Sequence, residues 1–252
     1  MTIKRQTWDN YITLLRKVSD RAATEMLAYI TYLHDQGIDN DEQIVLMIDY
    51  AFALATKYGE AAAAAACDMY DAVMLAQGLT MPAAIPAATA TKAEVAKAVR
   101  GTVKTGNPEI VAQAVGRLTK LAGVDTMQQN AIEHGDEWAW IPSGDTCAFC
   151  ITLASRGWQK ASNNAIKNGH AEHVHANCDC TYLVRKGGTD LTVEGYDPES
   201  LKQMYYDTGE DTPQSRINAL RREFYAENKE VINKQKREAY ERNKELEDFW
   251  PE

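Results

Sequence analysis

The feature that most constrains the fold of this chain is a group of four cysteines between residues 147 and 180, out of five in all 252 residues. They occur as Cys147-Ala-Phe-Cys150 and, after a short interval, as His175-Ala-Asn-Cys178-Asp-Cys180. Cysteines gathered this closely are typical of a tetrahedral zinc site. The sequence therefore predicts a small module that is held together around one metal ion.

The spacing leaves open which side chains bind the metal, because five candidates compete for four positions. The candidate ligands are Cys147, Cys150, His175, Cys178 and Cys180. His175 is also compatible with a surface position in a polar loop, and the nearby His170 and His173 are more typical of solvated loop residues. Cysteines that are free or joined in disulfides remain the alternative to a metal site.

A site with this many protein ligands is expected to be structural rather than catalytic. Catalytic zinc keeps one position open for water, whereas four or five available protein ligands favour closed coordination. His170-Ala-Glu172 is similar to the His-x-Glu of zinc deaminases, but the only Cys-x-x-Cys lies upstream of it, in the wrong order. We therefore expect no enzymatic activity. The alternative is a zinc-dependent nuclease or hydrolase acting on nucleic acid, with an open metal position beside His170 or His173.

Charge and hydropathy exclude several classes of protein. The net charge of −9 argues against a chain whose main task is nonspecific binding of nucleic acid. No apolar run is long enough to span a membrane, and the amino terminus lacks the apolar stretch of a signal peptide. We expect a chain that is made in a cytoplasm, where reduced thiols favour metal binding over disulfides.

The first half of the sequence has the periodicity of helices. Residues 1–80 predict a helical hairpin, with one helix capped by Thr7 and a second that starts after Asp39 or Asn40 and ends near Gly78. The alanine-rich run in the second helix predicts a packing surface. Two prolines then mark a linker, and residues 81–134 predict shorter helices: one over 92–103, one opening at Pro108, and another after Asp125.

The second half changes character at the cysteine module, predicted over residues 135–190. Trp138 and Trp140 alternate as in a short strand and are expected to supply its core, and a second strand is predicted at 181–184. Residues 191–252 predict a long polar helix from Pro213 to about Asp248, which is either solvated or docked on another subunit. The predicted fold is mostly α, with a long helical hairpin, shorter helices, a small α/β zinc-stapled module and a long C-terminal helix.

The cysteine segment resembles a known family. Trp138-Ala-Trp-Ile-Pro-Ser-Gly-Asp145-Thr-Cys-Ala-Phe-Cys150, Gly157 and then His175-Ala-Asn-Cys-Asp-Cys180 are similar to the carboxy-terminal signature of the phage Mu protein F-like minor head proteins. The resemblance covers about residues 135 to 185. This chain has Ala176 where the family usually has proline and Asp179 where it usually has arginine, which removes a positive charge beside the thiolates.

The resemblance implies a role in a virion rather than in chemistry. A member of this family is expected inside the phage head, near the portal, acting in head assembly or genome delivery. The implied partners are the portal protein, the major capsid protein or both, and packaged DNA is a candidate contact. Neither a membrane nor a small-molecule substrate is expected. The protein would be made in the host cytoplasm, and its cofactor would be structural zinc.

Overall fold

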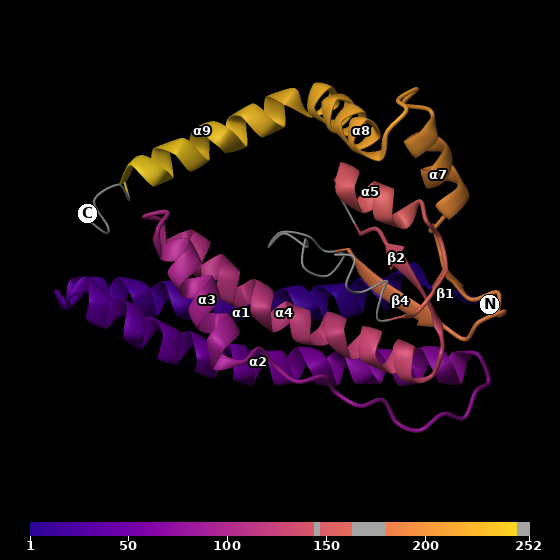
Figure 1. The fold of residues 1–252 in the computed structure, drawn as a ribbon, viewed down its shortest axis with the longest axis horizontal. Helices are drawn as coiled ribbons and strands as arrows, with labels where there is room; N and C mark the ends of the chain where they lie inside the picture. The colour runs from indigo at the N-terminus through magenta and orange to yellow at the C-terminus, as the bar shows by residue number, and fades with distance from the viewer. Residues whose placement is uncertain (144–146, 163–179, 246–252) are drawn as a thin grey trace.

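The computed structural model describes residues 1–143, 147–162 and 180–245 and shows a mostly helical fold (Figure 1). Its helices are α1 (Arg5–Asp35), α2 (Asn40–Ala76), α3 (Lys92–Val103), α4 (Pro108–Glu133), α5 (Ala148–Ala154), α7 (Pro198–Tyr206), α8 (Pro213–Glu227) and α9 (Lys229–Glu245). Its strands are β1 (Thr2–Ile3), β2 (Glu137–Ile141), β3 (Gln159–Lys160), β4 (Thr181–Arg185) and β5 (Thr192–Val193). The prediction of a mostly α fold is confirmed.

The first four helices form a bundle. Helices α1 and α2 run antiparallel, and α4 packs along both of them (Figure 1). The predicted start of α2 is confirmed, because Asp39 caps the helix by accepting a hydrogen bond from the Asp41 amide at 3.0 Å. The prediction that Thr7 caps α1 is wrong. That helix begins at Arg5, and its N-cap residue, Lys4, makes no side-chain capping bond.

Small residues let the helices of this bundle approach closely. A Cβ atom placed on Gly116 of α4 would lie 2.7 Å from the Ser19 carbonyl oxygen of α1. A Cβ on Gly123 would lie 3.0 Å from the Ala62 carbonyl oxygen of α2. Ala62 itself is fully buried, so the alanine run of α2 serves as a packing surface, as predicted.

The proline-containing segment between α2 and α3, residues 79–91, is called the strap below. It is extended and lies along the bundle (Figure 1). The Ala84 amide donates to Asp71 of α2 at 2.9 Å. The Ile85 amide donates to the Asn130 side chain of α4 at 2.9 Å, and the Asn130 side chain donates back to the Ile85 carbonyl at 2.8 Å. Side chains of α2 and α4 thus satisfy the backbone of a segment that has no secondary structure.

The second half of the chain adds a small sheet. Strands β3, β2 and β4 form an antiparallel sheet in that order, with Trp138 opposite Val184 and Ile141 opposite Thr181. Trp138 and Trp140 each meet the ring of Tyr182 edge-on, with centroids 4.6 Å apart. Trp140 is fully buried. Both predicted strands are confirmed, and the tryptophans form the core of the sheet as expected.

Two helix predictions are wrong. Helix α4 continues through Asp125, so no separate helix starts there. The long C-terminal helix is interrupted at Asn228, which separates α8 from α9 and whose side chain donates to the Phe224 carbonyl at 2.9 Å. An asparagine that bonds its own preceding turn competes with the helical ladder, and this explains the break.

Candidate metal centre

Cys147 and Cys150 lie at the start of helix α5. Cys147 is its N-cap residue, with extended backbone angles (φ −71°, ψ 159°) and no side-chain capping bond. Cys150 lies three residues further on, in the first turn of the helix. Both cysteines therefore lie at the beginning of a short helix, a position whose partial positive charge favours thiolates.

Cys180 comes from another part of the chain but reaches the same end of the sheet. It directly precedes β4, and because Thr181 pairs with Ile141, Cys180 is level with Pro142 at the end of β2. Cys150 and Cys180 are 1% and 3% exposed and belong to one apolar cluster, against which Cys147 packs. Cys150 and Cys180, from two separate segments, are thus buried in the same core cluster, which also includes residues of α1, α2 and α4.

This neighbourhood is apolar. Burial raises the pKa of the Tyr182 hydroxyl well above its usual range, although a hydrogen bond with Gln128 acts in the opposite direction. Tyr182 therefore stays neutral between the two tryptophans of β2. Charge on a thiolate here would be costly without a cation to balance it.

The donor set fits a structural metal in its chemistry, but the described residues do not complete a site. Within residues 1–143, 147–162 and 180–245, no three His, Cys, Asp or Glu side chains are grouped closely enough to hold a metal ion. The described cysteines are thiols rather than disulfides. The other predicted ligands, His175 and Cys178, lie outside the described residues, as do His170 and His173.

A second polar cluster lies where the bundle meets the sheet, and no sequence pattern pointed to it. Asp136 is fully buried between α4 and β2. It accepts from the Tyr70 hydroxyl at 2.6 Å and from the Lys186 ammonium at 3.1 Å. Lys186 also donates to the His134 carbonyl at 2.8 Å. Because these groups are hydrogen-bonded to one another, the cluster joins α2, α4 and β4 rather than forming a ligand site.

The fold therefore defines a class of protein: a helical bundle joined to a small sheet that carries a cysteine-bearing helix. The model of the VG15 protein family matches residues 2–208, and the chain belongs to this family of viral gene proteins. The match includes the bundle, the cysteine residues and α7, and it ends before α8. No curated protein and no solved structure matches the chain. Among the described residues, none of the helices is long and apolar enough to cross a membrane.

Proposed function

We propose that this viral protein is a minor head protein of a phage virion, located inside the capsid near the portal and acting in head assembly or genome delivery. The observation that carries the proposal is the family match over residues 2–208, together with the burial of Cys150 and Cys180 in one core cluster. These residues belong to the signature that resembles the Mu protein F-like family. The family match over residues 2–208 supports a viral role for the whole region around them.

The cysteines would hold a structural zinc ion. Cys147, Cys150 and Cys180, with Cys178 or His175 as a further ligand, would bind it. When bound, the metal would cross-link α5 to the start of β4. The chain's own contribution is to hold the thiolates in an apolar neighbourhood and to keep water away from them, since Cys150 and Cys180 are almost fully buried.

We propose that the protein acts without catalysis. A hydrolytic zinc needs an exchangeable water and a route for substrate. The burial of Cys150 and Cys180 under an apolar cluster leaves little room for either. The partners would be the portal protein, the major capsid protein or both, with packaged DNA as a candidate contact.

The role in the head is tested on virions of the phage that encodes the chain. We expect quantitative mass spectrometry to find it in purified heads, at a much lower copy number than the major capsid protein. Mild dissociation of the heads should release it together with the portal. The major tail protein, followed in the same fractions, is the control. A chain that is abundant in infected cells but absent from purified heads would contradict the proposal.

The metal is tested on the purified full chain by elemental analysis. One zinc ion per chain is expected, and substitution Cys147→Ser should abolish its binding, whereas Cys67→Ser, in α2, should not. A zinc ion with a bound water, detected by X-ray absorption spectroscopy, would contradict a closed structural site and favour the hydrolase alternative.

A further inference from the structure

Helices α8 and α9, residues 213–245, are called the arm below. Helix α8 packs through Leu220 against Tyr205 of α7 and Ala148 of α5. Helix α9 extends beyond this contact and lies apart from the bundle in Figure 1. None of its described side chains is buried, and Val231 and Tyr240 are 57% and 65% exposed. A helix this exposed covers none of the core of its own chain.

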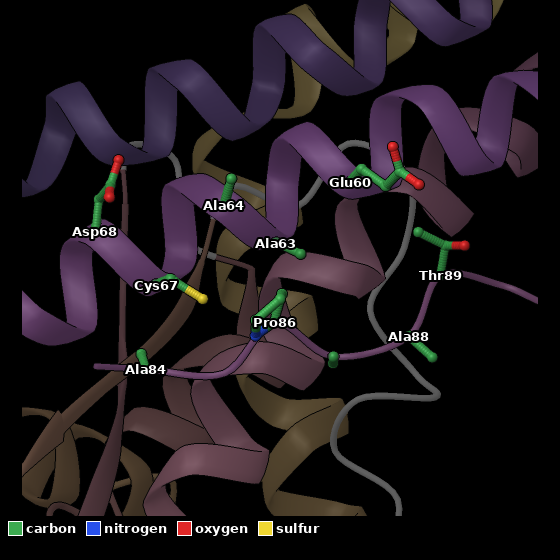
Figure 2. Close-up of a pocket in the computed structure, with 10 residues that line it drawn as sticks. Glu60, Ala63, Ala64, Cys67, Asp68, Ala84, Pro86, Ala88 and Thr89 are labelled. Atoms are coloured by element: carbon green, nitrogen blue, oxygen red, sulfur yellow. The ribbon is translucent and has the colours of Figure 1, made fainter. Parts of the chain in front are cut away.

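A groove lies on another part of the molecule, between α2 and the strap, with a volume of about 600 Å³. Figure 2 shows Cys67 pointing from α2 toward Pro86 of the strap, with Glu60 and Asp68 on the same helix to either side of it. The other lining residues are Ala63, Ala64, Ala84, Ala87, Ala88 and Thr89. The groove therefore has a floor of small apolar side chains, which permits close approach of a helix, and acidic groups at its edge.

Charge distinguishes the possible occupants of this groove. Between residues 213 and 245 the arm has nine basic and six acidic side chains, a net charge of +3. Helix α2 has one basic and six acidic side chains, a net charge of −5. Helix α3 has three basic and one acidic side chain, a net charge of +2. The arm is thus complementary to α2 and not to α3.

The arm of the same chain is on the wrong side to reach this groove. Figure 1 shows α9 on the side of α3 and α4, with α2 across the bundle from it. Folding back would bring α9 onto α3 and α4 rather than onto α2, and α3 has the same sign of charge as the arm. A second copy of the chain presents its α2 without this obstacle.

We infer that the α9 helix of one copy docks in the groove between α2 and the strap of a second copy. Its basic side chains, among them Lys234 and Arg237, face Glu60 and Asp68, and Tyr240 enters the alanine-lined floor. The two surfaces of this contact differ, so repeated contacts produce rings or open chains rather than a symmetric pair. The inference goes beyond the proposed role in the head and does not use the cysteine site, so its failure would leave that role standing.

The first test is the self-association of the full chain, measured by sedimentation velocity over a range of concentrations. We expect association that weakens as salt is raised, because it depends on exposed charges. Truncation after Asn228 removes α9 and residues 246–252. It should leave a folded monomer, because no described side chain of α9 is buried. A full chain that is monomeric at every concentration, or a truncated chain that associates equally well, would overturn the inference.

The second test reverses single charges. Glu60→Lys should weaken association about tenfold, because like charges then meet at the edge of the groove. Asp20→Lys is the matched control, since Asp20 is an exposed carboxylate on α1, away from the groove, and it should change little. Adding Arg237→Glu to Glu60→Lys should restore much of the lost affinity. A control variant weakened as strongly as Glu60→Lys would contradict the assigned surface.

The third test uses the thiol in the groove. In the variant Tyr240→Cys, mild oxidation should join the introduced thiol of one copy to Cys67 of another, giving a covalent dimer that peptide mapping identifies. The same variant carrying Cys67→Ser should give no such product. A disulfide between the introduced thiol and Cys67 of the same chain would show that the arm closes on its own bundle. This result would overturn the inference.

Discussion

The helical bundle and the cysteine sheet are stabilised by different kinds of contact. In the bundle, long helices meet at glycines and alanines, and the interfaces are large and apolar. In the sheet, the strands have at most five residues, and their buried side chains belong to a core cluster that also includes residues of α1, α2 and α4. Close helix contacts stabilise the first region by themselves, whereas a sheet this small needs either support from the bundle or a cross-link.

The largest effect is expected from removing the cross-link. Cys147→Ser, or a strong chelator, should release the metal and unfold the sheet while α1 and α2 stay helical, because structural zinc contributes about 10 kcal/mol in small sites. Hydrogen exchange read by mass spectrometry should show lost protection in β2 and β4 only. If Cys147→Ser keeps its full metal content and its stability, the sheet does not depend on a metal cross-link, and the proposed difference between the two regions is refuted.

The next effect concerns the junction between the regions. Lys186→Met removes the cation that faces the buried Asp136 carboxylate. We expect a loss of about 3 kcal/mol in the free energy of unfolding, below the effect at a fully buried pair because Lys186 is partly exposed. Chemical denaturation measures it. The control is Lys202→Met, which removes an exposed pair with Glu199 and should cost less than about 0.5 kcal/mol. Equal losses would mean that the junction is not stabilised by charge.

A smaller effect tests close packing in the bundle. Gly116→Ala places a methyl group against the Ser19 carbonyl and should destabilise the protein by about 2 kcal/mol. Gly101→Ala is the matched control, because nothing lies within 4 Å of a Cβ at this position of α3. It should stabilise the protein by up to about 1 kcal/mol through helix propensity. Thermal unfolding of the two variants should therefore shift in opposite directions, and a shared direction would argue against close contact of α1 and α4.

The smallest effect depends on pH. Asp125 is exposed on α4, yet surrounding protein and then Glu94 raise the pKa of its carboxyl from 3.8 to about 6. Because the folded state holds the proton of this carboxyl more tightly than the unfolded state does, its contribution to the free energy of unfolding is fully present below pH 3.8. That contribution is lost as the pH rises through about 6. Asp125→Asn should thus stabilise the protein at neutral pH, by less than about 1 kcal/mol since solvent screens the site, and give no gain near about pH 3. If the stability difference between Asp125→Asn and the unchanged protein is the same at every pH in this range, the raised pKa of Asp125 is disproved.

Local signals in the sequence predicted much of the helical half. The bounds of α3 and the caps Asp39 and Asn107 follow from side chains that bond to neighbouring amides, so a short window contains the information. These features depend on contacts near in sequence. The metal site predicted from the cysteine spacing stays a prediction, because the described residues do not complete it.

The remainder depends on contacts that no local pattern records. The bond between Tyr70 and Asp136 joins residues 66 apart, and an aspartate between a helix and a strand resembles an ordinary loop residue. Helix α5 was not predicted, because seven residues are too few to show a helical periodicity. The break at Asn228 was missed because the surrounding residues have high helix propensity.

The pairing of β1 with β5 has a consequence for the order of folding. Thr2 lies opposite Thr192 and Ile3 opposite Val193, in parallel, so the first residues of the chain complete a ladder with residues made far later. Closing so long a loop is entropically expensive, and contacts of this range form slowly. During synthesis the bundle can assemble as it leaves the ribosome, whereas β1 can pair only after β5 has been made. We therefore expect this two-stranded ladder to be the last part of the molecule to form and the first to open.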